Sequence, residues 1–323
     1  MKSVGEIISD LTPTLEELEP DRLLYRKKSS TYLLVIFLPL IGIAIAAISL
    51  KAAMPFMIGG MIWLVLSVIL YQIKAGTIAS RYKARYKATI IPQLLKTIDP
   101  QLSHAPEQGI PSSAFVESEL FKTKPDRYQT EDLIHGIYGK TLLQLAEVNA
   151  QQRQTSTDSN GRSRTRYVSY FDGLLLIADF HKHFEGRTFI FPDKAEKTFG
   201  GFARFFQKAG GRKETRLIQL ENPDFEYQFK VYATDEVEAR YILSTSMMQR
   251  IAAMQSRFGK DVRIAFKDSR LILTVPHSKP FLEPNTKTAA TDPAQIEDML
   301  KDLVFFLDTI EELDLNTRIW TKA

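Results

Sequence analysis

The sequence lacks cysteine altogether, and it contains only five histidines and two tryptophans among 323 residues. The absence of cysteine excludes disulfide bonds, thiolate metal ligands and thiol nucleophiles, and it is compatible with a reducing compartment. A large excess of one charge is also lacking, because 42 basic and 38 acidic residues leave a formal net charge of +4. Short basic clusters before residue 90 explain much of this excess, so we expect no nucleic-acid partner.

Charged residues are also absent from two long apolar runs, residues 32–50 and 56–73. Each run has about 18–20 residues, enough for a helix to cross a hydrocarbon core of roughly 30 Å. Neither run has the polar face that a helix on a soluble core would show. The sequence therefore predicts a two-helix transmembrane hairpin over residues 31–73.

The flanks of the hairpin are basic, whereas its connecting turn contains only Lys51. The flanking cations are Arg22, Arg26, Lys27 and Lys28 on one side and Lys74, Arg81, Lys83, Arg85 and Lys87 on the other. Because basic loops stay on the cytoplasmic side, we expect both termini and the main domain to be cytoplasmic. Arg81, Lys83, Arg85 and Lys87 are predicted to contact anionic lipid, with Tyr82 and Tyr86 at the headgroups.

The rest of the chain divides into three further segments. Residues 1–30 are predicted to form a cytoplasmic helix that starts at Thr14, because Glu17 completes a capping box. Residues 74–110 are interpreted as a juxtamembrane helix followed by an irregular linker from Pro92 onward. Residues 111–323 are left for one cytoplasmic domain.

That domain combines short strands with helices, which predicts an α+β fold built on a mostly antiparallel sheet. The expected strands are residues 138–147, 164–177, 187–191, 214–220, 225–233, 262–266 and 270–275. Residues 235–243 and 245–258 are predicted to be helical, and 113–121 to be a short helix or strand. A last helix starts at Asp292-Pro293 and carries an apolar stripe through Leu303 to Ile310. The polar residues 151–165 are predicted to form a mobile hairpin tip.

Several short motifs in this domain occur together in one order. They are Glu117-Ser118-Glu119-Leu120-Phe121, Asp126-Arg127-Tyr128, Glu131-Asp132-Leu133, Gly136, Gly139, Phe171-Asp172-Gly173-Leu174, Phe225-Glu226-Tyr227-Gln228-Phe229-Lys230-Val231-Tyr232, Glu238-Ala239-Arg240-Tyr241-Ile242-Leu243 and Leu315-Asn316-Thr317-Arg318-Ile319-Trp320. Over roughly residues 110–320 the chain resembles the bacterial domain-of-unknown-function family 3137. The resemblance implies two membrane spans in a bacterial inner membrane and an uncharacterised domain, and it supplies no catalytic residue or cofactor.

Few residues suggest chemistry. Gly139-Lys140-Thr141 lacks the first glycine of a phosphate-binding loop and opens a strand where that motif opens a helix. His181 and His183, with Glu185, form the one compact set of metal-type ligands, and an exposed turn is the simpler interpretation. Glu131 and Asp132 are adjacent, and adjacent residues on a strand face opposite ways. We therefore assign no catalytic residue, metal or cofactor.

The segment 194–208 is basic and aromatic. As a helix it would place Phe199, Phe202 and Phe206 on one face, with Lys208 among its cations. This composition suits a helix lying on a membrane or meeting a partner. Gly200 and Gly201 weaken an isolated helix and favour rings that pack on a sheet, and both interpretations stay open. The expected function is a membrane-tethered, non-enzymatic scaffold or sensor that binds a protein partner or lipid headgroups. The alternative is a membrane-associated enzyme using carboxylate or histidine chemistry.

Overall fold

The computed structural model describes residues 4–49, 53–157, 161–179, 185–193, 215–259, 261–277 and 279–317. The chain forms two compact units. Unit 1 contains residues 1–98 and 282–300, and unit 2 contains residues 99–281 and 301–323. The predicted helix at 194–208 and the histidines at 181 and 183 lie outside the described residues.

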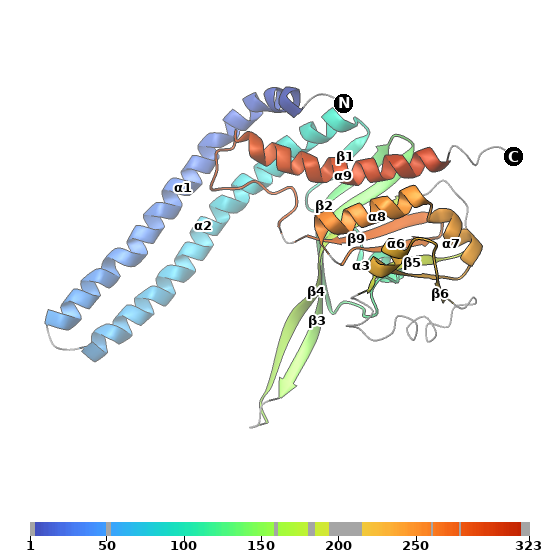
Figure 1. Ribbon diagram of the computed structural model, residues 1–323. Helices are drawn as coiled ribbons and strands as arrows, with labels where there is room; N and C mark the ends of the chain where they lie inside the picture. The colour runs from blue at the N-terminus through green and yellow to red at the C-terminus, as the bar shows by residue number, and fades with distance from the viewer. Residues whose placement is uncertain are drawn as a thin grey trace. The chain divides into compact units, whose positions relative to one another are not determined.

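Unit 1 is built on two helices, α1 (Val4–Ser49) and α2 (Ala53–Ile98). They pair antiparallel: the hydroxyls of Ser29 and Tyr71 lie 3.0 Å apart, and Thr14 Oγ1 donates to Gln93 Oε1 at 3.3 Å. Figure 1 shows the two helices side by side along their length.

Both helices extend beyond the limits that the sequence predicted for them. α1 begins at Val4, before the predicted cap at Thr14, and α2 continues past Pro92 to Ile98. Packing explains the difference, because buried apolar residues recur at helical spacing on both helices and outweigh the missing proline hydrogen bond. These residues are Ile7, Leu11, Leu15 and Leu18 on α1 and Tyr86, Ile90, Ile91, Leu94 and Leu95 on α2.

A loop after residue 281 joins unit 1 through charged contacts. Glu19 Oε2 accepts a hydrogen bond from the Ala290 backbone N at 2.7 Å, and Glu19 Oε1 lies 2.5 Å from Arg22 Nη2. The hydrogen bond from Arg22 is the main reason that the pKa of Glu19 is lowered. Arg22 itself is buried, so this predicted flanking cation is already paired within the protein.

Unit 2 is organised on a nine-stranded sheet in the order β1-β2-β3-β4-β9-β8-β5-β7-β6. Every pairing of neighbours is antiparallel, which confirms the predicted α+β fold. The strands are β1 (Leu102–Ala105), β2 (Arg127–Tyr138), β3 (Thr141–Thr157), β4 (Ser163–Asp179), β5 (Thr188–Pro192), β6 (Arg216–Ile218), β7 (Phe229–Ala233), β8 (Arg263–Lys267) and β9 (Arg270–Pro276).

The later helices begin where a short polar side chain caps them, whereas the first begins after Pro111 without a side-chain cap. The helices after β1 are α3 (Ser112–Glu117), α6 (Pro223–Gln228), α7 (Glu236–Ile242), α8 (Thr245–Phe258) and α9 (Pro293–Thr317), whose residues 293–300 belong to unit 1 and the rest to unit 2. The prediction of a strand over 225–233 was wrong in its first half. Asn222 Oδ1 accepts from Asp224 N and Phe225 N, and Pro223 occupies the first turn, so a helix forms there.

The sheet buries both of its faces along its central strands. One face packs on α3 and the residues after it, where Phe115 and Phe121 stack with ring centroids 4.7 Å apart. Neighbouring residues on β4, such as Leu174 and Leu175, are both fully buried although they point to opposite faces. Burial on both sides explains the continuous apolar runs of β4 and β5.

The helix α9 carries the predicted apolar stripe, and the structure buries it. Leu303 is fully buried in unit 2. We expect Leu303→Asp to cost several kcal/mol, because the carboxylate would lie in an apolar site without a partner. Thermal unfolding of the full chain in detergent measures this cost. Leu142→Asp is the matched control, because Leu142 is 51% exposed, and equal stability losses in both variants would contradict the prediction.

A close backbone approach explains the glycine of the Phe171-Asp172-Gly173-Leu174 motif. A Cβ at Gly173 would lie 2.1 Å from Val275 O on the neighbouring strand β9. We expect Gly173→Ala to force β4 and β9 apart, at a cost of about 1–3 kcal/mol, and to speed amide hydrogen exchange in both strands. Gly76→Ala is the control, since its Cβ would meet no atom within 4 Å. Unchanged exchange in the Gly173 variant would refute this explanation.

Candidate functional site

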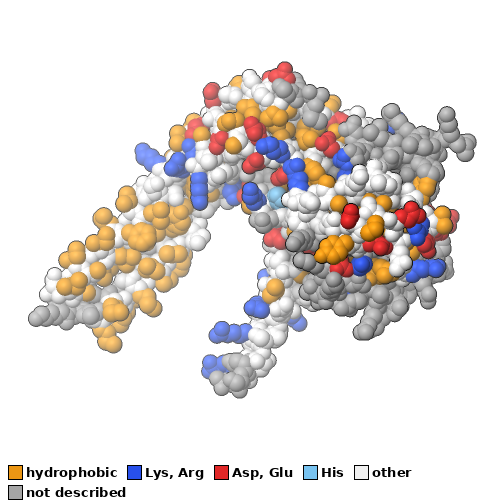
Figure 2. All heavy atoms as spheres, in the orientation of Figure 1, with side chains coloured by type: hydrophobic (Ala, Val, Ile, Leu, Met, Phe, Trp, Pro, Cys, Tyr) orange, Lys and Arg blue, Asp and Glu red, His pale blue; other side chains and the backbone are white. Residues whose placement is uncertain are grey.

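The paired helices α1 and α2 expose a long apolar surface. Only 6% of the residues in the most apolar segment of each helix are buried. The exposed side chains include Leu34, Leu38, Ile45, Ile48, Met54, Met57, Met61 and Leu70. Figure 2 shows apolar side chains spread over the paired helices. By length and composition both helices are candidate membrane spans.

Polar groups within these spans find partners inside the helical pair. Trp63 Nε1 on α2 donates to the Ile36 backbone oxygen on α1 at 3.3 Å. Ser67 is buried and its hydroxyl donates to the Trp63 backbone oxygen at 2.6 Å. The outer surface therefore stays apolar, which is the arrangement that a hydrocarbon solvent requires.

The basic residues that flank the spans fall into two groups. Those nearest the apolar surface are exposed: Arg26, Lys27, Lys28, Lys74 and Arg81. Those farther along α2 are paired with acids of unit 1. Arg85 Nη1 lies 2.6 Å from Asp21 Oδ2, and Glu283 accepts from Lys83 at 2.5 Å and lies 3.6 Å from Lys87.

This pairing bears on the four residues predicted to contact lipid. Arg81 is exposed, Arg85 and Lys83 are partly exposed within ion pairs, and the side chain of Lys87 is only 7% exposed. Lys87 therefore has little surface with which to reach a headgroup. Sequence reasoning missed Glu283, because a partner 200 residues away from Lys83 leaves no local pattern.

Tyr82 and Tyr86 were expected at the headgroups, and the structure instead buries both. Burial raises the pKa of the Tyr82 hydroxyl to about 12 and raises the pKa of Tyr86 as well. The Tyr86 hydroxyl donates to Met299 Sδ at 3.9 Å within unit 1. These rings hold the helical pair and the start of α9 together, so they do not form a membrane belt.

The remaining predicted contact residues, Phe199, Phe202, Phe206 and Lys208, lie outside the described part of the chain, as do His181 and His183. The structure therefore neither supports nor contradicts their assignments. Glu185 is described and exposed, and its backbone N donates to Glu238 Oε1 at 3.1 Å.

A carboxylate cluster forms in unit 2 where the sequence argued against one. Glu131, Asp132 and Glu147 each place an oxygen within 4.8 Å of the others. The strand rule fails here because β2 has an irregularity between Glu131 and Ile134, and Asp132 has a left-handed φ of 57°. Oxygen sets of this kind can bind hard cations such as Ca²⁺ or Mg²⁺.

The structure also offers a non-catalytic explanation of these acids. Asp132 Oδ1 lies 3.1 Å from His104 Nε2, and both side chains are fully buried. Glu147 Oε2 accepts from the Phe281 backbone N at 2.9 Å. The cluster thereby ties β1, β2, β3 and Phe281 together, and the side chains of His104 and Asp132 have no solvent-accessible surface.

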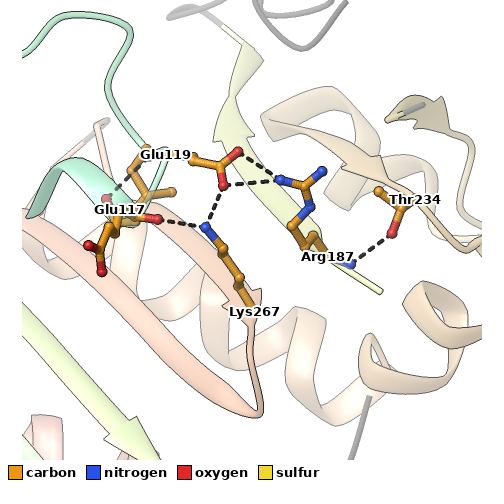
Figure 3. Close-up of polar contacts among 7 residues, drawn as sticks. Glu117, Glu119, Arg187, Thr234 and Lys267 are labelled. Atoms are coloured by element: carbon orange, nitrogen blue, oxygen red, sulfur yellow. Dashed lines mark hydrogen bonds and ion pairs between the residues drawn. The ribbon is translucent and has the colours of Figure 1, made fainter. Parts of the chain in front are cut away.

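A second polar cluster, shown in Figure 3, involves Glu119 of the Glu117-Ser118-Glu119-Leu120-Phe121 motif. Both carboxylate oxygens of Glu119 accept from Arg187 Nη1 at 3.1 Å, and Glu119 also accepts from Lys267. Lys267 Nζ further donates to the Glu117 backbone oxygen at 2.9 Å. Because Glu119 stands between the two cations, the cluster fastens the segment after α3 to β5 and β8 and offers no open anion site.

Comparison with known protein families matches one family over part of the chain. The profile of a family described as "Protein of unknown function (DUF3137)" matches residues 169–315, from within β4 to near the end of α9. This match is shorter than the resemblance inferred from sequence, and the motifs at residues 117–139 precede it. No curated protein matches the sequence.

One solved structure is similar in part, the crystal structure of the mycobacterial trehalose monomycolate transport factor A, TtfA. The similarity covers 65% of this chain and 86% of that one, with 10% sequence identity and a TM-score of 0.33. A similarity of this size carries no argument about function. The family match supports the resemblance to family 3137 that the sequence motifs indicated, over residues 169–315.

Proposed function

We propose that this protein is a multi-pass protein of a bacterial inner membrane, anchored by the central segments of α1 and α2. The observation that carries the proposal is the apolar outer surface of the helical pair, with Trp63 and Ser67 bonded inward. In water such a surface would expose far more contiguous apolar area than the few hundred Å² usual for soluble proteins. In hydrocarbon it has no such cost.

The orientation follows from the charges at the two ends of the helical pair. Because Ser29 and Tyr71 are hydrogen-bonded, the exposed cations at 26–28 and at Lys74 lie at the same end. The opposite end carries only Lys51. The positive-inside rule then supports a cytoplasmic position for both chain ends and for the sheet of unit 2.

We further propose that unit 2 is a non-enzymatic scaffold or sensor module that binds a protein partner or lipid headgroups. Its described clusters of ionisable side chains support this role, because Glu119 pairs with Arg187 and Lys267, and Asp132 pairs with His104 Nε2. The alternative, a membrane-associated enzyme, has one observation in its favour, the cluster of Glu131, Asp132 and Glu147.

Cysteine labelling tests the anchor and its orientation, because the natural sequence has no cysteine to interfere. With a membrane-impermeant maleimide on intact cells, we expect Met54→Cys to react. We expect Lys28→Cys and Leu142→Cys to react only after lysis. The reverse pattern would contradict the orientation. Release of the protein from membranes by alkaline carbonate would contradict the anchor itself.

Crosslinking in native membranes, followed by mass spectrometry, tests the binding role. We expect discrete adducts between unit 2 and a protein or lipid, and we expect them to persist in a Glu131→Gln variant. The exposed Glu131 is the variant of choice, because it removes one charge of the carboxylate cluster without leaving the buried His104 unpaired. A functional defect in this variant with unchanged adducts would favour the enzyme over the scaffold.

A further inference from the structure

The strands β3 and β4 continue beyond the rest of the sheet as a two-stranded ribbon. β2 pairs with β3 only as far as Gln151, and β9 pairs with β4 only from Gly173 onward. Past these points β3 and β4 pair only with each other, through the register Gln152↔Val168 to Thr157↔Ser163. Figure 1 shows this ribbon extending from the sheet of unit 2. We define the β3–β4 ribbon as residues 152–157 and 163–168.

The ribbon is ordered by its own polar contacts. The hydroxyls of Thr155 and Thr165 lie 3.2 Å apart, and those of Thr157 and Ser163 lie 3.0 Å apart. The polar stretch was predicted to be a mobile tip, and the strands instead run to Thr157 and restart at Ser163. Cross-strand pairs of this kind stabilise a ladder that has no apolar face to bury.

All the charge on the described part of this ribbon is positive. Arg153, Arg164 and Arg166 are exposed, and Arg162 adds a fourth cation beside the ribbon. No aspartate or glutamate occurs among the described residues 151–157 and 161–170, and Asp158 at the tip is the one acid in the sequence between them. Figure 2 shows basic side chains along the ribbon.

The charge of the ribbon contrasts with the rest of unit 2. Cations elsewhere, such as Arg187 and Lys267, are matched by Glu119, and Arg257 is matched by Asp302. Arg166 has only a long contact of 3.4 Å with the neutral Gln154. At the ribbon's base the guanidinium of Arg127 lies 3.5 Å from the ring centre of Tyr167. Among the described residues of the ribbon, no carboxylate stands beside the side chains of Arg153, Arg164 and Arg166. An acid contacts the ribbon at its base, where Asp126 Oδ2 accepts from the Arg153 backbone N at 2.8 Å.

We propose that the β3–β4 ribbon binds the anionic phospholipid headgroups of the membrane that holds α1 and α2. This inference rests on the proposed function, because the anchor supplies a headgroup surface at high local concentration. Arginine pairs with phosphate through a planar, two-pronged set of donors. Strand alternation puts Arg164 and Arg166 on one face of the ribbon and Arg153, opposite Tyr167, on the other, so both faces present arginine. The basic, polar composition of the ribbon suits an anionic partner and does not suit burial in an apolar core.

The test uses the full chain in lipid nanodiscs with a fluorophore on a single introduced cysteine. Ser156→Cys places the label on the ribbon, and Leu142→Cys places it near the opposite end of β3. With anionic lipid and a headgroup-attached quencher, we expect quenching of the ribbon label and much less of the Leu142 label. We expect the contact to weaken as salt rises, since screening shortens the range of charge to about 10 Å at 0.1 M.

Charge removal supplies the matched variants. Arg153, Arg164 and Arg166 changed together to Gln should weaken the headgroup contact on the order of 100-fold, at about fivefold for each arginine. The control changes Lys140, Arg216 and Arg270 to Gln, with the same change in net charge at exposed positions off the ribbon. This control should keep the quenching of the parent.

The outcomes separate the ribbon from the anchor. If the chain does not enter nanodiscs, the anchor fails, and the same labelled chain mixed with anionic vesicles still decides the ribbon. Equal quenching in neutral and anionic lipid, or equal loss in both triple variants, overturns the inference. A ribbon label that responds to duplex DNA and not to anionic lipid also overturns it.

Discussion

The unfavourable contact between water and the apolar side chains of α1 and α2 constrains every other part of this protein. The two helices satisfy their backbone hydrogen bonds internally, and Trp63 and Ser67 donate to backbone oxygens within the helical pair, so their outer surface suits hydrocarbon better than water. The apolar surface ends at the exposed cations near Lys28 and Lys74, and beyond them the helices carry charged side chains.

Charged side chains in this protein either pair with one another within the fold or, on the β3–β4 ribbon, gather as a group of one sign. Several charged side chains join segments that are distant in sequence, as Glu283 does with Lys83 and Lys87, and Glu119 with Arg187 and Lys267. Such pairs hold loops and strand ends in place, because a half-buried charge needs its partner. The β3–β4 ribbon departs from this pattern, since its described residues are basic without an acid among them.

The sheet of unit 2 is a scaffold whose two faces are already covered at its centre. The aromatic cluster around Phe115 and Phe121 occupies one face, and the other buries residues such as Leu174 and Leu176. Gly173 lets β4 and β9 approach closely at the point where the covered sheet ends and the ribbon begins. The centre of this sheet therefore has little free surface for a partner, and its periphery has more.

Patterns within a few residues of sequence were enough to predict the apolar helices, several strands and the start of the last helix. Runs without charge marked the apolar helices, and Asp292-Pro293 marked the start of α9, where Asp292 Oδ1 accepts from Ala294 N. The strands expected over residues 164–177, 262–266 and 270–275 likewise form, as β4, β8 and β9. Each depends on side-chain periodicity or capping within a few residues.

Tertiary structure alone decided the features whose cause is distant in the chain. Packing carried α1 past Thr14 and α2 past Pro92, buried Tyr82 and Tyr86, and gave Lys87 its partner Glu283. An irregularity in β2 turned Glu131 and Asp132 toward Glu147, against the alternation of a regular strand. Contacts between residues far apart in sequence leave no local pattern, because their energy arises only once the fold has brought them together.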